Sequence, residues 1–232
     1  MEEGISIVMP VLGNAKYTKE FFSSFVKTHA THLFVFEFVV INNGKDKETK
    51  EVLNKYKGYF GGDKFSIIEN EQNAGVCRSW NQGVEKSKYP FICIVNNDIE
   101  FRTMNGILPL RDTLKKHRNV YWTSPKTCYE KDSKKRIIQR PHHYEQLRYG
   151  ITVDHYVVGC CFMCPKICFE EIGLFDEEFD IKYYEDLDFI NRILEHGKKI
   201  KMTEESLIYH AVGATSKHTA GGGMNEINYH KK

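Results

Sequence analysis

Two short runs of acidic and amide side chains are the places where this chain could do chemistry. The first is Asn96-Asn97-Asp98, which directly follows the apolar run Phe91 to Val95. A carboxylate flanked by amide oxygens suits a hard cation such as Mg²⁺ or Mn²⁺. The alternative is a polar turn after a core strand, because Asn and Asp are common turn residues.

The second run is Tyr184-Glu185-Asp186-Leu187-Asp188, which precedes an apolar pattern with helical spacing that ends at Gly197. The helix dipole favours acids in a first turn, so these acids could be N-terminal caps. Tyr183 and Tyr184 make the segment more apolar than a simple surface cap. A carboxylate in such surroundings is suited to act as a base. Both interpretations remain open at this point.

Strands and helices alternate through the first half of the chain and would position these residues. We expect strands at Ile5 to Met9, Leu33 to Ile41, Phe65 to Ile68 and Phe91 to Val95, and helices after Thr18, at Thr49 to Tyr59 and at Val76 to Lys86. Pro10 is expected to end the first strand, and Thr18 to cap the first helix. The alternation predicts an α/β fold with a mostly parallel central sheet flanked by helices.

Ligands of such sheets bind outside the carboxyl ends of the strands. We therefore expect four loops to converge on one crevice: Pro10 to Asn14, Asn42 to Lys45, Asn73 to Arg78, and Asn96 to Asp98. None of these loops carries the glycine fingerprint of a Rossmann or P-loop site, which disfavours a dinucleotide or an ATP γ-phosphate as ligand.

The second half of the chain is less regular. We expect a helix at Gly106 to His117, strands at Val120 to Ser124 and Ser206 to Tyr209, an exposed loop or hairpin at Glu130 to Arg140, an apolar segment at Val157 to Met163, and a mobile or ligand-ordered tail from Gly213. The pair His142-His143 invites a metal interpretation, but without further ligands nearby a surface loop is the better explanation.

Composition limits the class of protein. The chain has 232 residues, 41% of them hydrophobic and 13% aromatic, enough for one α/β domain with a real core. A formal net charge of +2 implies no polyanionic partner. The acidic start Met1-Glu2-Glu3 is no signal peptide, and no apolar segment approaches the roughly 20 residues of a membrane span. We expect a soluble, cytoplasmic protein without a membrane span.

Seven cysteines are present. The spacing Cys161-x-x-Cys164, followed by Cys168, is similar to a metal or iron–sulfur run. No second pair with matching spacing follows it, and Pro165 separates an apparent strand from a helix start. Buried free thiols in a reducing compartment are therefore the better explanation, with a cluster as the alternative.

Taken in order, these features resemble the family 2 glycosyltransferases of the GT-A fold. The matching segments are Ile7-Val8-Met9-Pro10, Val39 to Gly44, Asn73-Ala74-Gly75, Trp80-Asn81-Gln82-Gly83, Asn96-Asn97-Asp98, Gly173-Leu174-Phe175-Asp176, Tyr184 to Asp188 and Tyr209-His210. The resemblance covers roughly residues 5 to 216. It implies a single GT-A domain over 1–232, with a nucleotide-sugar-binding half at about 1–101, an acceptor and catalytic half at about 102–216, and a flexible tail at 217–232.

The resemblance also implies roles near the metal. Asn96, Asn97 and Asp98 match the DXD motif, whose acids hold a Mg²⁺ or Mn²⁺ ion that bridges the two phosphates of the donor. Asn96 stands where the family often has Asp, which leaves Asp98 as the principal carboxylate ligand. His210 matches a histidine that completes the metal shell in some members; a polar residue that ends a strand is the alternative.

Further roles follow from the same resemblance. Asn42 takes the place of an acid that usually contacts the nucleotide base or ribose. Arg78 lies where a cation or polar side chain often stands near the nucleotide, and the loop at Asn73 belongs to the same region. Pro10 and Val11 are implied to line the pocket by their backbone. Glu185 and Asp186 match the acidic block that supplies the general base, and Asp186 is the preferred base.

The implied reaction is an inverting, metal-assisted transfer of a sugar from a UDP-, dTDP- or GDP-sugar to an acceptor hydroxyl. The implied acceptor is a glycan, a lipid-linked or another hydroxyl compound; a nucleic acid bound at Glu130 to Arg148 ranks lower. Two alternatives are a catalytically weak sugar-nucleotide-binding scaffold on this fold and a nucleotidyltransferase. The latter would normally have a Gly-rich basic loop after the first strand, and Val11 to Lys16 does not provide one.

Overall fold

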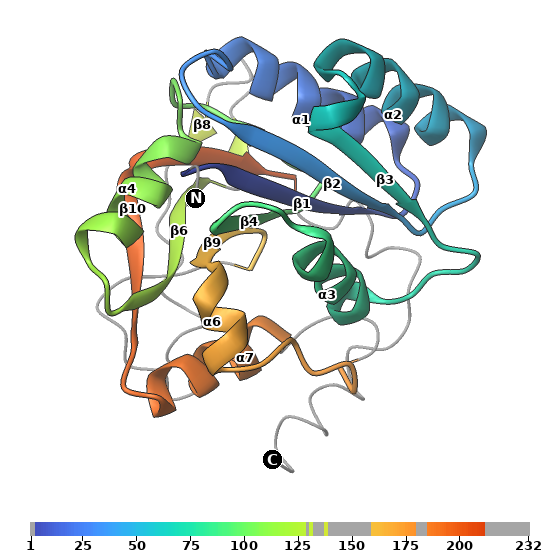
Figure 1. Ribbon diagram of the computed structural model, residues 1–232. Coiled ribbons are helices and arrows are strands. Elements are labelled where there is room, and N and C mark those ends of the chain that lie inside the picture. Colours follow the sequence, from blue (N-terminus) through green and yellow to red (C-terminus); the bar gives the residue numbers. More distant parts are fainter. Residues whose placement is uncertain (1–2, 129, 132–136, 139–158, 180–184, 212–232) are drawn as a thin grey trace.

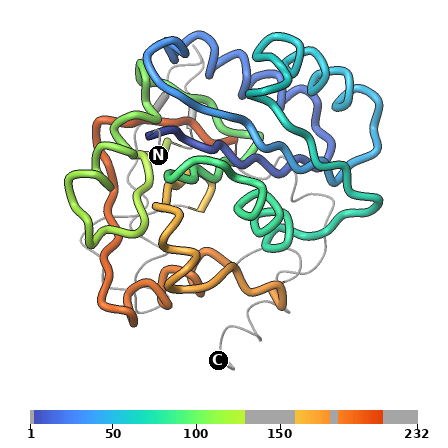
Figure 2. Tube along the Cα trace, in the orientation of Figure 1, coloured from blue at the N-terminus to red at the C-terminus, as the bar shows by residue number. Residues whose placement is uncertain are grey.

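The computed structural model describes residues 3–128, 130–131, 137–138, 159–179 and 185–211 (Figures 1 and 2). The interpretations placed on His142-His143 and on the glycine-rich tail fall outside these residues. The predicted loop or hairpin at Glu130 to Arg140 falls partly inside them, and there β7 (Glu130–Lys131) pairs with β8 (Ile137–Ile138) in an antiparallel hairpin.

An eight-stranded sheet runs through the molecule in the order β3-β2-β1-β4-β9-β6-β10-β5. Its strands are β1 (Ile5–Val11), β2 (Phe36–Asn42), β3 (Phe65–Glu69), β4 (Phe91–Val95), β5 (Ile99–Phe101), β6 (Val120–Cys128), β9 (Cys161–Pro165) and β10 (Lys199–His210). Neighbouring strands are parallel from β3 to β4 and between β6 and β10, whereas β9 and β5 run antiparallel to their neighbours. The prediction of a mostly parallel α/β sheet is confirmed.

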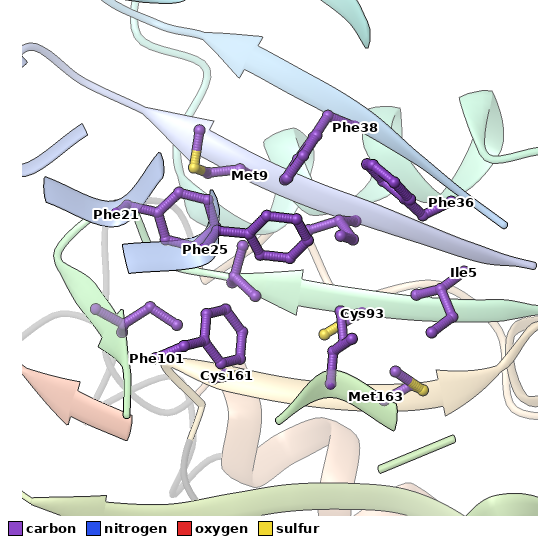
Figure 3. Packing of buried hydrophobic residues seen from close by; sticks show 14 of the residues in the cluster. Ile5, Met9, Phe21, Phe25, Phe36, Phe38, Cys93, Phe101, Cys161 and Met163 are labelled. Carbon is purple, nitrogen blue, oxygen red and sulfur yellow. The ribbon is translucent and has the colours of Figure 1, made fainter. Parts of the chain in front are cut away.

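Helices cover both faces of this sheet (Figure 1). They are α1 (Ala15–Thr28), α2 (Lys47–Phe60), α3 (Val76–Lys86), α4 (Ile107–Lys116), α6 (Lys166–Glu171) and α7 (Glu185–Glu195), with a 3₁₀ turn at Gly62–Lys64. Side chains of α1, α2 and α4 share one buried cluster with the sheet, and those of α3, α6 and α7 share the other. The first cluster is rich in phenylalanine, as Figure 3 shows for Phe21, Phe25, Phe36 and Phe38.

Pro10 does not end the first strand, contrary to the expectation. The strand β1 continues to Val11, with Pro10 opposite Ile41 of β2. The N–H of Ile5 and the C=O of Val11 both bond on the β2 side. Since successive residues of a strand point their backbone groups to opposite sides, Pro10 faces the β4 side, where pairing stops at Val8. Its missing N–H therefore costs no ladder bond.

Thr18 is not the cap of the first helix. Asn14 occupies that position, with a left-handed backbone (φ 59°) and no capping side-chain hydrogen bond. Thr18 lies one turn further along, fully buried, and its hydroxyl accepts a hydrogen bond from Nδ2 of Asn97 (2.9 Å). The spacing of Phe21, Phe22 and Phe25, which predicted the buried face of the helix, is confirmed.

The cysteines are free and buried at all seven positions. Cys161 packs in the cluster under α1, together with Cys93 (Figure 3), whereas Cys164 and Cys168 pack in the cluster under α3 and α7. Residues three apart on a strand point to opposite faces of the sheet. The Cys161-x-x-Cys164 pattern therefore cannot hold a single cluster, and the explanation as buried thiols is confirmed.

His29 at the end of α1 makes the fold sensitive to acid. Its Nε2 accepts a hydrogen bond from the N–H of Ile107 (3.2 Å), the first residue of α4, and its ring stacks on Phe25 at 4.3 Å. An imidazole that accepts at Nε2 must be neutral when Nδ1 carries the proton. Burial lowers the pKa of His29 to about 4.

We expect His29 to lower the free energy of unfolding by about 2 kcal/mol between pH 7 and pH 5. The unfolded histidine takes up a proton near pH 6.5 and the folded one only near 4, so this stability is complete above 6.5 and is lost as pH falls toward 4. Urea unfolding of wild type and His29→Gln at pH 7, 6 and 5 measures the contribution, because glutamine can also accept from Ile107 but does not titrate. Parallel pH curves for the two proteins would contradict it.

Candidate active site

The loops at the carboxyl ends of β1, β2 and β3 are joined by Asn43. Its N–H donates to the carbonyl oxygen of Val11 (2.8 Å), its Nδ2 donates to the Ser79 hydroxyl (2.8 Å), and its Oδ1 accepts from Nδ2 of Asn70 (2.8 Å). Gly44 packs so closely on the backbone of Gly13 that a Cβ would lie 2.9 Å from the Gly13 nitrogen. These contacts bring the loops after β1 and β2 together with the start of α3, and the convergence of all four loops on one crevice stays a prediction.

Several residues expected to bind the nucleotide lie at this edge, with different exposure. Val11 is buried in the core and its carbonyl is already bonded, so it offers little to a ligand. Pro10 is partly exposed at the end of β1. Asn73, which precedes α3, and Arg78, in the first turn of α3, are both exposed. Oδ1 of Asn73 accepts a hydrogen bond from the N–H of Gly75 (3.1 Å). Asn42 is fully buried.

The Asn96-Asn97-Asp98 loop follows β4 and is fixed from three directions. The N–H of Asn96 donates to the carbonyl of Cys160 (2.8 Å), the amide of Asn97 donates to Thr18, and the carbonyl of Asp98 accepts from the N–H of Ala211 (3.0 Å). The loop therefore joins β4 to the residue before β9, to α1 and to the end of β10. Such anchoring is more than a polar turn needs.

Asp98 and His210 form a buried ion pair. Nε2 of His210 lies 3.2 Å from Oδ1 of Asp98, and the two side chains are 15% and 8% exposed. Burial alone would lower the pKa of His210, but the nearby Cys160 and Asp98 outweigh it and raise that pKa to about 11. Oδ1 of Asp98 makes no well-aligned hydrogen bond to any residue that the structure describes. A carboxylate oxygen in this state is fit to accept a cation.

The helix α7 begins with two acids, Glu185 and Asp186, whose surroundings differ. Burial, and then the negative charge of Asp186, raise the pKa of Glu185 to about 8. Oδ1 of Asp186 accepts from the N–H of Leu187 (2.9 Å), and its carboxylate lies against Gly159. The raised pKa of Glu185 favours its protonated form near neutral pH. The third acid, Asp188, is used structurally, in an ion pair with Arg192 (2.9 Å).

The two-residue segment Gly159-Cys160 adjoins both acidic groups. Cys160 contacts His210 and lies near Asp98, and its carbonyl accepts from Asn96. The preceding residue, Gly159, touches Asp186. Asp98 and Asp186 are far apart in the sequence, and the structure brings both next to one short backbone segment.

The helix α3 lies close to the same acids and to the turn before α7. Burial, and then the charges of Glu185, Asp188 and Asp186, raise the pKa of the Cys77 thiol in the first turn of α3. At the next turn, Nδ2 of Asn81 donates to the carbonyl oxygen of Phe175 (2.9 Å). Oδ1 of Asn81 accepts from the N–H of Phe175 (3.0 Å). The Trp80 to Gly83 and Gly173 to Asp176 motifs are therefore one structural unit.

We expect Gly159→Ala to reduce turnover about 100-fold while leaving nucleotide affinity nearly unchanged, because small displacements of a reacting group have effects of this size. A Cβ at Gly159 would collide with the Cβ, Cγ and Oδ2 of Asp186 and displace them. Comparing kcat with nucleotide Kd measures the effect. Gly58→Ala on α2, where a Cβ meets open space, is the control. An unchanged kcat in the Gly159 variant would mean that turnover does not depend on the position of the Asp186 carboxylate.

Sequence reasoning missed three residues of this edge. Cys160 is a buried thiol of the core, as predicted for the cysteines, but its contact with His210 was not foreseen. Gly159 was not singled out, although only a glycine fits against Asp186. Glu69 was not considered, although it accepts a hydrogen bond from Asn42. An acid at the last position of a predicted strand was a usable signal for Glu69; the other two depend on distant contacts.

No helix within the described ranges is long and apolar enough to cross a membrane. In the same ranges, the His, Cys, Asp and Glu side chains do not come together as a ready group of three metal ligands.

The chain is similar to known proteins over most of its length. It is 25% identical over 191 residues to uncharacterized glycosyltransferases of Rickettsia prowazekii (strain Madrid E) and of Rickettsia typhi (strain ATCC VR-144 / Wilmington), which covers 79% of this chain and 56% of each relative. A crystal structure of GalNAc-T7 with UDP, GalNAc and Mn²⁺ matches with a TM-score of 0.73 at 19% identity, covering 98% of this chain and 48% of that one. The chain thus has the GT-A fold and spans about half the length of these relatives.

The family model described as glycosyl transferase family 2 matches residues 6–173. This span contains all but the first residue of β1, the strands β2 to β4, the Asn96 to Asp98 loop and the Gly159-Cys160 segment. The protein belongs to glycosyltransferase family 2.

Proposed function

We propose that this chain is the catalytic domain of an inverting glycosyltransferase that moves a sugar from a nucleoside diphosphate donor to an acceptor hydroxyl. One observation carries the proposal: Asp186 lies against Gly159, and the Asp98–His210 pair lies next to Cys160, so one two-residue segment adjoins both acidic groups. Such a transfer needs one group for the departing diphosphate and another for the attacking hydroxyl, and the chain offers an acidic group for each.

Asp98 and His210 are the residues that would hold a Mn²⁺ or Mg²⁺ ion. The buried, poorly bonded Oδ1 of Asp98 supports this assignment, and carboxylate oxygens suit Mn²⁺ and Mg²⁺. When bound, the ion supplies a Lewis acid that stabilises negative charge on the diphosphate. His210 must give up its proton to become a ligand, so metal binding should release a proton.

Asp186 is proposed as the general base. Its carboxylate takes the proton of the acceptor hydroxyl as that oxygen forms a bond to the anomeric carbon of the sugar. The bond from this carbon to the diphosphate oxygen breaks at the opposite face, so the configuration inverts. The pKa of Glu185 is raised to about 8, which makes it a poorer candidate for the base near neutral pH.

The edge formed by β1, β2, β3 and the start of α3 is proposed to hold the nucleotide. Asn73, Arg78 and Pro10 are exposed there, whereas Asn96 and Asn97 hold the loop of Asp98 in place. GalNAc-T7, which has the same fold, was crystallised with UDP and Mn²⁺. We therefore propose a UDP-, dTDP- or GDP-sugar as donor, residues 1–101 as the donor half and 102–216 as the acceptor half.

Incubating the protein with each nucleotide-sugar in Mn²⁺ or Mg²⁺ tests the proposal. A raised melting temperature identifies the donor, and slow release of nucleoside diphosphate and free sugar shows catalysis. Stabilisation without any release would favour the scaffold alternative. Formation of pyrophosphate from a nucleoside triphosphate and a sugar phosphate would favour a nucleotidyltransferase.

A further inference from the structure

Asn42 and Glu69 stand opposite each other at the carboxyl ends of β2 and β3. Nδ2 of Asn42 donates to Oε2 of Glu69 (2.8 Å), and Oδ1 of Asn42 accepts from the N–H of Gly44 (3.2 Å). Because a backbone N–H can only donate, the second contact fixes which end of the amide faces Glu69.

The amide of Asn42 is therefore used in hydrogen bonds within the fold. Its side chain is fully buried, and both ends of its amide have partners inside the fold. A nucleotide cannot reach it without breaking these contacts. Asn42, at the position where family members usually have an acid, thus holds the side chain of Glu69 instead of a ligand.

Glu69 has the opposite properties. Its side chain is 50% exposed, and its polar contacts within the described residues involve Oε2: the hydrogen bond from Asn42 and a long ion pair with Lys50 at 3.9 Å. A pair of this length between half-exposed groups stabilises a protein very little. The second oxygen, Oε1, makes no contact of this kind in the described part of the chain. An oriented carboxylate with one uncommitted oxygen is suited to bind a ligand.

We infer that Glu69, held in place by Asn42, binds the ribose hydroxyls of the nucleotide donor; this inference rests on the proposed function. A carboxylate near the end of the second strand accepts from ribose hydroxyls in other α/β nucleotide sites. In this chain the corresponding carboxylate is Glu69, which lies at the end of the neighbouring strand β3. Hydrogen bonds to a charged acceptor are stronger than neutral ones, so Glu69 would favour a ribose over a deoxyribose.

The test is titration calorimetry with UDP, 2′-deoxy-UDP, GDP and 2′-deoxy-GDP in Mn²⁺. Wild type should bind the ribonucleotide of its preferred base about ten-fold more tightly than the deoxy form, the usual value of one charge-assisted hydrogen bond. Glu69→Gln should reduce that ratio to about two-fold, because the charge is lost. The variant should fold normally, since the oxygen of the new amide can still accept from Asn42. Thermal melting checks this point.

Glu51→Gln is the matched control, because Glu51 lies on the exposed side of α2 with 66% exposure and the variant removes the same charge. It should keep the wild-type ratio. An unchanged ratio in Glu69→Gln, an equal loss for both sugars, or a wild type that binds the deoxy form equally well would overturn the role of Glu69 and leave the proposed function standing. No binding of any of the four nucleotides or of dTDP, titrated in the same way, would overturn the proposed function itself.

Discussion

Asp186→Asn is expected to lower sugar transfer by about 1,000-fold, within the range for loss of a general base, while donor binding stays nearly intact. The amide is isosteric and its oxygen can still accept from the N–H of Leu187, so the first turn of α7 should keep its shape. It cannot take the acceptor's proton. Transfer rates set against nucleotide Kd separate the two effects.

Glu185→Gln is the informative partner variant. Since the pKa of Glu185 is raised to about 8, glutamine imitates the protonated side chain that wild type carries below that pH. We expect near-normal transfer at pH 7, and loss of whatever rate change wild type shows as pH rises through 8. A large loss in Glu185→Gln together with activity in Asp186→Asn would exchange the two roles. Equal loss of transfer and nucleotide binding in Asp186→Asn would remove the base assignment.

Asp98→Asn is expected to weaken Mn²⁺-dependent nucleotide binding by about 100-fold or more, because even the outer partners of metal ligands have effects of 10- to 100-fold. The neutral amide is a poorer ligand for a hard cation, and His210 loses its charged partner. Titration of nucleotide with Mn²⁺, and again with a chelator, measures the metal-dependent part. We expect the chelated values of wild type and variant to agree.

The buried ion pair makes folding a necessary control for this variant. Removing one partner of a buried pair can destabilise a protein by about 3–5 kcal/mol. A melting curve must therefore accompany each titration, and His210→Gln, which keeps Asp98, provides a second variant. If Asp98→Asn remained folded and bound nucleotide in Mn²⁺ as tightly as wild type, Asp98 would not be a metal ligand.

Local patterns predicted the elements that depend on neighbouring residues alone. The helix Val76–Lys86 and the strand Phe91–Val95 were predicted with the bounds that the structure shows. The early part of β10 was missed because Lys199 to Glu205 has the composition of an exposed segment, yet its residues Lys199 to Thr203 pair with β6. The roles of Pro10 and Thr18 were predicted wrongly because they depend on distant partners. Pairing of β1 with β4 stops before Pro10, and Asn97 forms a hydrogen bond with Thr18.

The acids of the candidate site were visible in the sequence because they follow strands or begin a helix. Their relation was not. The placement of Asp98 near Cys160, and of Asp186 against Gly159, depends on the antiparallel strand β9 being inserted between β4 and β6. Nothing in the local pattern near Val157 to Met163 reveals that direction. The exchange of roles between Asn42 and Glu69 likewise depends on the register of β2 against β3.

The double hydrogen bond between Asn81 and Phe175 has a consequence for protein engineering. It fastens a helix from the first part of the chain to the turn that leads toward α7. A chimera that joins the amino-terminal segment of one relative to the carboxy-terminal segment of another would bring together an amide and a backbone that have not been selected to fit. Designers of such hybrids should transplant this contact as a matched pair, or place the crossover so that it is inherited whole.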